Sequence, residues 1–293
     1  QAIALDLLLT GPTEHDTVLA AALDPRTAIA LSLTEIGSPL SAQMERRIEE
    51  NRFTLVRNRL PEGPKGMLGP QQAFAERAQL GHVNLRLDDD GALRRFPVAM
   101  RYGDGAALPA LAVVAARLKA GEEALSLVSG ETLILGDRQI PLGADNMAVL
   151  NYFGPRGTIK TLSILQAETA DVAGKLVFIG GTADGYRDSF ETPFDTAFPG
   201  VEALATLAAN ILAGTTLRRD QSTWVLDVLL AIFGAMFAAF AASRARPLWA
   251  FLGSLSVWGA GLVILQTGFV NTLWLDATTL IGALILGTLL GFA

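Results

Sequence analysis

Aspartates stand at three places in this sequence where strands are expected to end or turns to begin. Asp6 lies within an apolar, strand-like run at residues 2–10, and Asp16 lies in a predicted helix over residues 14–23. Asp188 lies in a long loop beyond a second apolar strand. Carboxylates at the carboxyl ends of strands in an α/β sheet often line a ligand crevice, and they suit turns and helix caps equally well. We therefore treat Asp6, Asp16 and Asp188 as candidate ligand-binding residues, with capping as the alternative.

A glycine-rich turn follows the continuous apolar run at residues 176–179, which predicts a buried central strand. Its sequence, Gly180-Gly181-Thr182-Ala183, suits the binding of an anion but matches neither the dinucleotide fingerprint nor the P-loop. Asp188 and Thr192 lie farther along the same loop. Loops of this length in a compact domain are usually functional or tightly pinned. We predict signal recognition here; the alternative is that Asp188 pins the loop by accepting backbone hydrogen bonds.

An acidic turn, Asp88-Asp89-Asp90-Gly91, separates strands predicted at residues 82–87 and 94–102. The Asp-Gly pair is typical of a tight hairpin, and Arg94 is expected to form a salt bridge with an inner carboxylate. Asp90 and Arg94 also remain candidate ligand-binding residues. The triple aspartate would attract a cation such as calcium, but it lacks the ligand spacing of an EF-hand loop.

The remaining composition excludes several kinds of chemistry. The sequence has no cysteine, which excludes disulfides and thiolates. His15 and His82 are too few and too far apart for a recognisable metal site, and no nucleophile elbow is present. The net charge of −6 argues against nucleic acid as a partner. We therefore predict no catalytic site, metal or cofactor in this chain. The alternative is a membrane-bound hydrolase using Asp188 with Asp6 or Asp16 on a metal.

The elements that position these residues form a mixed pattern over residues 1–220, which predicts an α/β domain with a mixed sheet flanked by helices. Strands are predicted at 2–10, 27–33, 53–58, 82–87, 94–102, 133–135, 138–140, 148–153 and 176–179. Helices are predicted at 14–23, 43–51, 108–119 and 200–213. A tight hairpin is expected at Gly136-Asp137.

Residues 221–293 are a different kind of sequence. Three apolar segments, at about 224–243, 247–265 and 273–293, have the roughly 20 mostly apolar residues that a membrane-spanning helix needs. Soluble cores rarely place three such runs in succession, so we predict a three-helix transmembrane region in contact with the lipid bilayer. Three crossings place the two ends of this region on opposite sides. The arginines do not decide the orientation, because one pair lies in the first loop and another precedes the first helix.

Two features of these segments bear on their packing. Ala283, Gly287 and Gly291 recur every four residues, which permits close approach of another helix, including one from a second copy of the chain. The alternative is that glycine is simply common in membrane helices. Asp227 and Asp276 are acids close to tryptophans that would mark the interface, and we expect both to reach the lipid headgroups.

Several stretches in this order resemble a known family. They are AIALDLLLT with Glu14-His15-Asp16; Gly81-His82-Val83-Asn84 with Asp90-Gly91 and Arg94-Arg95; Asn151-Tyr152-Phe153-Gly154-Pro155; and the segment from Ile179-Gly180 through Asp188 and Thr192-Pro193 to Pro199-Gly200-Val201-Glu202. Together they resemble the second family of CHASE domains, extracellular sensors associated with cyclases and histidine kinases. The resemblance spans nearly all of residues 1–220, and three membrane helices after the sensor are typical of the family.

The resemblance implies a multi-pass protein of the bacterial inner membrane, with the sensor outside, in the periplasm, and the C-terminus in the cytoplasm. Its output is expected to be a class III adenylate or guanylate cyclase that would use ATP with Mg or Mn. Alternatives are a histidine kinase, a Ser/Thr kinase, a diguanylate cyclase, or a membrane-anchored binding subunit of a transporter. A homodimer and an unknown extracytoplasmic ligand or protein partner are also expected. The family's opening helix, first strand and output domain are not among these residues, so we expect the protein to continue beyond them.

Overall fold

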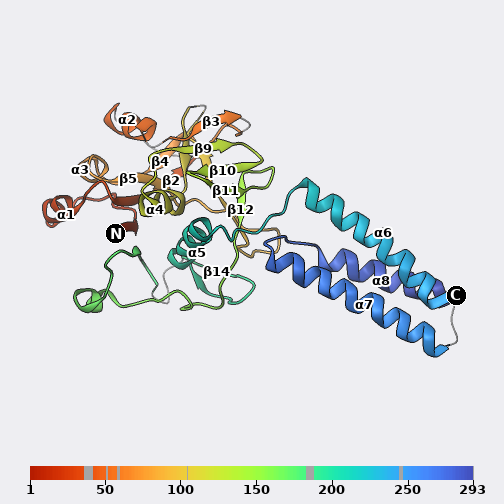
Figure 1. Ribbon diagram of the computed structural model, residues 1–293. Helices are drawn as coiled ribbons and strands as arrows, with labels where there is room; N and C mark the ends of the chain where they lie inside the picture. Colours follow the sequence, from red (N-terminus) through yellow and green to blue (C-terminus); the bar gives the residue numbers. More distant parts are fainter. Residues whose placement is uncertain are drawn as a thin grey trace. The chain divides into compact units, whose positions relative to one another are not determined.

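The computed structural model describes residues 1–35, 42–50, 52–57, 60–103, 105–182, 188–243 and 247–292. The chain divides into two compact units, Gln1–Thr216 and Leu217–Ala293. The first unit combines strands with helices and the second is built on helices (Figure 1). The mixed α/β architecture predicted for the first part of the chain is confirmed.

The first unit is organised around a parallel sheet. Its strands follow the order β13 (Leu176–Gly180), β1 (Ala2–Asp6), β2 (Thr27–Thr34) and β5 (Gln79–His82), and all three pairings are parallel. The short strand β4 (Gly66–Leu68) pairs antiparallel with the end of β2. The strand predicted at residues 2–10 therefore ends at Asp6, where its pairing with β13 also ends.

One face of this sheet is lined by small side chains. Ala4, Ala28 and Ala30 are fully buried there, in one core with α4 (Leu111–Ala120) and α5 (Gly200–Ala213). Alanine leaves room for a helix to lie close to the strands. Residues 111–116 of α4 are apolar on every side of the helix and are buried, as expected for such a segment.

Larger side chains fill the opposite face. Leu5 and Ile29 pack there with residues of α1 (Asp16–Ala22) and α3 (Gln72–Ala75). Farther along the same face, residues of α2 (Ala42–Glu50) join the core. Side chains of successive strand residues point to opposite faces, so the alternation of alanine with leucine and isoleucine produces three layers, with helices on both sides of the sheet.

A second sheet of four strands has the order β11 (Arg138–Pro141), β10 (Thr132–Leu135), β9 (Leu125–Val128) and β3 (Thr54–Arg57). The first two pairings are antiparallel, and β3 runs parallel to β9. The tight hairpin predicted around Gly136 is confirmed: it joins β10 to β11, and Gly136 has a φ of 57°.

The hairpin predicted between residues 82–87 and 94–102 is wrong. The acidic turn itself is present, with the amide of Gly91 donating to the carbonyl of Asp88 at 2.8 Å and Gly91 at a φ of 84°. However, His82 already pairs with β2, so the chain before the turn belongs to the parallel sheet. The segment after the turn is divided between separate two-stranded ladders instead of returning along β5.

These ladders complete the first unit. They are β6 (Arg95–Pro97) with β12 (Met147–Val149), β7 (Ala99–Arg101) with β8 (Ala107–Pro109), and β14 (Ser189–Phe190) with β15 (Phe198–Pro199). A 3-10 helix, η1, covers Ile164–Thr169. The last ladder lies beside the first residue of α5 and helps to position the candidate site described below.

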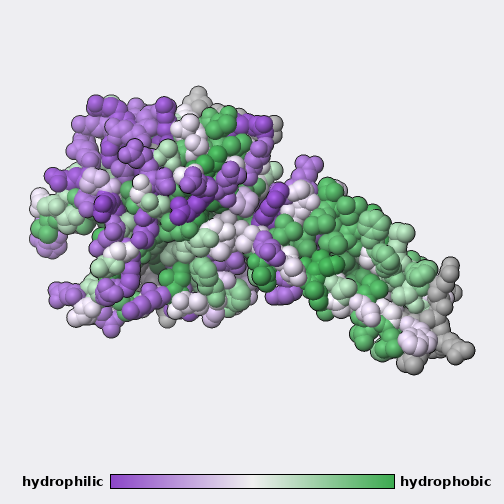
Figure 2. All heavy atoms as spheres, viewed as in Figure 1, coloured by the Kyte–Doolittle hydropathy of each residue, from purple (hydrophilic) through white to green (hydrophobic). Residues whose placement is uncertain are grey.

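The second unit contains α6 (Gln221–Ser243), α7 (Pro247–Val270) and α8 (Ala277–Phe292). Apolar side chains cover much of its visible surface (Figure 2). Two segments, Gln221–Ser243 and Phe251–Val270, are long and apolar enough to cross a membrane. Helix α8 is apolar but has 16 residues, or about 24 Å at 1.5 Å per residue, against a hydrocarbon core of about 30 Å. The third crossing stays a prediction.

The glycines of α8 are used within the chain. A Cβ atom on Gly287 would collide with the backbone of Ala235 in α6, and one on Gly291 would collide with the backbone of Ala239. These four small residues thus let α6 and α8 approach closely. Ala283 lies half-buried on the same helix. This close contact is made by a helix of the same chain, so a contact with a second copy would need another surface.

Candidate functional site

Two strands of the parallel sheet end side by side at Asp6 and Gly180. Asp6 is the last residue of β1 and pairs in register with Gly180, the last residue of β13. The helix that follows β1 lies on one face of the sheet, whereas α5, which follows β13, lies on the other. Ligand crevices in open α/β sheets form at such a place, outside the carboxyl ends of the strands.

Helix α5 begins at this edge with Gly200, and Asp188 lies against its first turn. The backbone amide of Gly200 donates to the carbonyl of Asp188 at 2.9 Å. A Cβ atom on Gly200 would lie 2.6 Å from both carboxylate oxygens of Asp188. A Cβ atom on Gly180 would lie 2.8 Å from the Val201 Cβ and 3.2 Å from the Asp6 Cβ. Both glycines are therefore needed for close approach, and the start of a helix is a favourable place for the Asp188 carboxylate.

Asp6 and Asp188 also interact electrostatically. Burial, and then the charge of Asp188, raise the pKa of Asp6 to about 7. Burial also raises the pKa of Asp188. In the part of the chain that the structure describes, neither carboxylate forms a salt bridge. The pair is therefore arranged to take up a proton or a cationic or hydrogen-bond-donating group, because each of these relieves the repulsion.

Thr192 does not join this pair, because its own loop engages its hydroxyl. That hydroxyl donates to the carbonyl of Asp195 at 3.1 Å and accepts from the amide of Asp195 at 3.1 Å. Thr192 is buried, which fits a residue that fixes the loop. The glycine turn predicted to hold an anion runs into residues 183–187, which lie outside the described residues.

Asp16 is engaged elsewhere, at the start of α1. Its carboxylate accepts from the amide and the hydroxyl of Thr13 at 2.9 and 2.6 Å and from the Gln71 side chain at 2.7 Å. These hydrogen bonds lower its pKa. In the described ranges, no group of three or more His, Cys, Asp or Glu side chains is placed to hold a metal ion. The hydrolase alternative therefore has two nearby carboxylates, Asp6 and Asp188, and Asp16 is not their partner.

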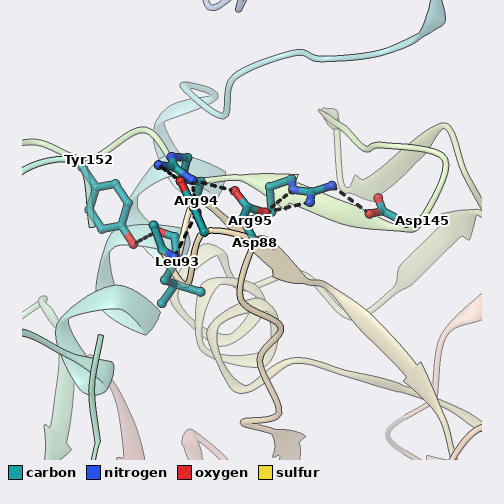
Figure 3. Close-up of polar contacts among 8 residues, drawn as sticks. Asp88, Leu93, Arg94, Arg95, Asp145 and Tyr152 are labelled. Carbon is teal, nitrogen blue, oxygen red and sulfur yellow. Dashed lines mark hydrogen bonds and ion pairs between the residues drawn. The ribbon is translucent and has the colours of Figure 1, made fainter. Parts of the chain in front are cut away.

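The acidic turn and the arginines after it form a separate network (Figure 3). Arg94 donates to both carboxylate oxygens of Asp90, at 2.8 and 2.7 Å, and to Asp88 at 3.2 Å. Asp88 is the less exposed of the two acids, so the predicted bridge from Arg94 to an inner carboxylate is confirmed. The hydrogen bonds from Arg94 lower the pKa of Asp90 to about 2. Because Asp90 and Arg94 form a two-bonded ion pair with each other, we assign this network a structural role.

Two members of this network, Arg95 and Asp145, were not predicted. Arg95 donates to Asp88 at 2.7 and 2.8 Å and to Asp145 at 3.1 Å (Figure 3). The adjacent charges of residues 88–95 were a local signal for Arg95. Asp145 gave none, because it reaches Arg95 only through the pairing of β12 with β6.

Glu202, the last residue of the Pro199-Gly200-Val201-Glu202 segment, has a structural role. Its buried carboxylate accepts from the amides of Gly157 and Ile159, at 2.9 and 3.2 Å. It therefore fastens the loop after β12 to the first turn of α5. This turn begins with Gly200 beside Asp188, so the Pro199-Gly200-Val201-Glu202 segment helps to position the candidate site.

His82 is fully buried at the end of β5. Neither ring nitrogen has a hydrogen-bond partner within the described chain, and burial lowers the pKa of His82 to about 3. The side chain is therefore neutral at physiological pH and behaves as part of the core.

Comparison with known families links this geometry to a class of proteins. The family model of the CHASE2 domain matches residues 1–243, which include the whole α/β unit and α6. Neither the comparison with curated proteins nor that with solved structures found a match. CHASE2 is an extracellular sensor domain found in cyclases and kinases. The match covers well over half of the chain, which therefore belongs to the CHASE2 domain family.

Proposed function

We propose that this chain is the sensor and transmembrane portion of a bacterial signalling receptor, and that it regulates a C-terminal cytoplasmic class III cyclase. One observation carries the proposal: a unit of a sensor family is followed directly by helices long and apolar enough to cross a membrane. The sensor lies outside the inner membrane, and the helices pass its state to the output domain.

The topology consists of three crossings, by α6, α7 and α8. Pairing between Arg218 and Leu273 supports it, because the segment before α6 and the loop before α8 meet at one end of the bundle. In this topology that end, with Arg218 and Arg219, faces outward, and the segment with Arg244 and Arg246 faces the cytoplasm. The positive-inside rule does not decide between the two pairs, so the orientation rests on the extracellular position of CHASE2 domains.

Single cysteines test this topology, because the chain has none of its own. We expect Leu165→Cys and Asn271→Cys to react with a membrane-impermeant maleimide on spheroplasts. Ser243→Cys and a C-terminal epitope tag should become accessible only after permeabilisation. A tag accessible from outside would remove the third crossing, and labelling of Ser243→Cys from outside would reverse the orientation.

The output is tested with the natural full-length polypeptide. Its intact mass should exceed the mass of these residues by that of at least one domain, and its membranes should form cyclic AMP or cyclic GMP when given ATP or GTP with Mg²⁺ or Mn²⁺. Class III cyclase sites form between two subunits, so the protein is expected to be a homodimer. Phosphotransfer without cyclic-nucleotide formation would favour the kinase alternative. A mass equal to that of these residues would favour a binding subunit of a transporter.

We further propose that Asp6 and Asp188 form the signal-recognition site. Their proximity, their burial and the lack of a described salt-bridge partner favour a ligand with a positive or hydrogen-bond-donating group. Calcium, magnesium and a linear diamine are simple probes. At least one should raise the unfolding temperature of the wild-type chain but not of Asp6→Asn or Asp188→Asn. Asp89→Asn, which changes an exposed acid, is the control. Equal shifts in all four proteins would refute this site.

A further inference from the structure

A polar cluster lies where the chain enters α6, and it centres on Asp227. Asp227 is the one charged residue in the sequences of α6, α7 and α8. Its side chain is 5% exposed, and the depth expected from the sequence, at the headgroups, stays a prediction. Acids in apolar helices are unfavourable unless they are paired, and they often mark functional positions.

The Asp227 carboxylate joins three segments. One oxygen accepts from the guanidinium of Arg219, which precedes α6, and the other accepts from the backbone amide of Asp276 at 2.9 Å. The same Arg219 nitrogen donates to the carbonyl of Trp274 at 2.9 Å. A single ion pair thus connects residues 217–220, α6 and the segment that begins α8. We call this set the Asp227 clamp.

Backbone pairing strengthens the clamp. The amide of Arg218 donates to the carbonyl of Thr272 at 2.7 Å, and the amide of Trp274 donates to the carbonyl of Arg218 at 3.1 Å. This makes a parallel bridge between Arg218 and Leu273. Both carboxylate oxygens of Asp227 therefore accept hydrogen bonds, and the segments at Arg218 and Leu273 pair through their backbones.

Helices α6 and α8 both begin next to the Asp227 clamp. Asp220 accepts from the amide of Thr223 at 2.9 Å, and Asp276 accepts from the amide of Thr278 at 2.9 Å. Both are contacts of the kind that cap helix N-termini. The start of α6 and the start of α8 are thereby fixed to the same short segment.

The segment between the sensor unit and the clamp is very short. The sensor unit ends at Thr216, and Arg218 already pairs with the loop before α8. Two residues span at most about 7 Å. Such a short segment cannot absorb a large displacement. A movement of the sensor's C-terminal end is therefore transmitted to the clamp.

We propose that Arg219 and Asp227 are coupling residues, which hold the segment leaving the sensor to α6 and α8 at once so that both helices move together when that segment moves. This inference rests on the proposed receptor function. It differs from a purely stabilising role, because it predicts that the helices stay packed when the clamp is opened and that only the connection to residues 217–220 is lost.

Disulfide formation tests the connection in membranes containing the full chain. The pair Arg218→Cys and Leu273→Cys occupies the backbone bridge and should crosslink rapidly, since bridge partners lie about 5 Å apart. The pair Gly234→Cys and Leu284→Cys joins α6 to α8 where a Cβ atom on Gly234 would lie 3.2 Å from the Leu284 side chain, and it reports helix packing.

Asp227→Asn should slow crosslinking of the first pair about five-fold or more, because it removes the charge that holds Arg219. It should leave the second pair within about two-fold of its original rate. Arg219→Gln should act alike, and the double variant should lose less than the sum of the two single effects, as expected for a direct pair. Unchanged crosslinking of the first pair, additive effects, or loss of both pairs together would overturn the proposal.

The natural full-length protein separates this inference from the proposed function. With the clamp intact, Asp6→Asn should change the output activity; in the Asp227→Asn background that change should disappear. A change that persists with the clamp opened refutes the coupling role. If Asp6→Asn changes nothing with the clamp intact, the recognition site fails, and the crosslinking result alone decides the clamp.

Discussion

Replacing Asp6 by asparagine should stabilise the sensor unit above neutral pH. In the folded chain the pKa of Asp6 is raised to about 7 by burial and by Asp188. In the unfolded chain it is close to the ordinary value of 3.8. Between these values the folded state holds a proton that the unfolded state lacks. The free energy of unfolding therefore falls as the pH rises from about 4 to 7 and stays lower above pH 7.

The size of this effect follows from the shift. One pKa unit corresponds to about 1.4 kcal/mol, so a shift of about three units sets a ceiling of about 4 kcal/mol. Part of the shift is caused by Asp188, and the pair also retains some contact with solvent. We expect Asp6→Asn to gain about 2 kcal/mol over wild type at pH 8 and to match it near pH 4.

Urea unfolding of the chain in detergent, followed by amide hydrogen exchange, measures this difference. Peptides from β1 and β13 report on the sheet edge. Tryptophan fluorescence would not, because all four tryptophans lie between residues 224 and 274. Asp89→Asn removes an exposed acid of the same unit and controls for the change in net charge.

A loss of stability on replacing Asp6 at pH 8 would refute the reasoning, because it would mean that the ionised carboxylate has a stabilising partner. A gain of equal size at pH 4 and pH 8 would also refute it, since the effect must vanish where the folded wild type is protonated.

Three further substitutions test other parts of the structure. The pKa of His82, lowered to about 3 by burial, should make stability fall by up to about 1.4 kcal/mol per pH unit as the pH drops below about 6.5, because only the unfolded state is protonated there; urea titrations of His82→Leu should lack this slope. Gly287→Leu should separate α6 from α8 by collision with Ala235, at a cost of about 1–3 kcal/mol; loss of the Cys crosslink between these helices would record it, and Gly282→Leu, with open space around it, should not cause it. Tyr152→Phe should cost about 1 kcal/mol in urea unfolding, because the hydroxyl donates a 2.7 Å hydrogen bond to a backbone carbonyl.

Local patterns predicted the elements of the fold better than their partners. The apolar run at residues 176–179 predicted a strand correctly, but its predicted place in the centre of the sheet was wrong. Among the described strands β13 lies at the edge, pairs with β1 and is only half-buried, and nothing in the run specified this partner from the opposite end of the unit. The Asp90-Gly91 turn was predicted correctly, whereas its hairpin was not, because pairing with β2 had already determined the direction of β5. Long-range pairing depends on burial of whole faces, which a short window of sequence does not contain.

In the candidate site, too, local patterns predicted individual residues better than their partners. Asp6 was selected in a strand-like run and Asp188 in the loop beyond another strand. The pairing of Asp6 with Gly180, and the start of α5 beside Asp188, bring the two together. The headgroup depth expected for Asp227 stays a prediction, whereas its ion pair with Arg219 was not predicted. Its partner Arg219 lies in the segment before α6, outside the helix. The spacing of residues within the helix therefore could not reveal the pair. Such contacts follow from the packing of three separate segments.

The position of β1 in the sheet has a consequence for biogenesis. The partner of Ala2 is Leu176, so one edge of the first strand stays open until nearly the whole unit has been made. If the unit is exported, it emerges with Ile3 and Leu5 uncovered, and folding through such distant contacts is slow and exposed to aggregation. Closure of the sheet then comes shortly before α6 is synthesised. If α6 enters the bilayer, its entry therefore follows closely on the completion of the sensor's sheet.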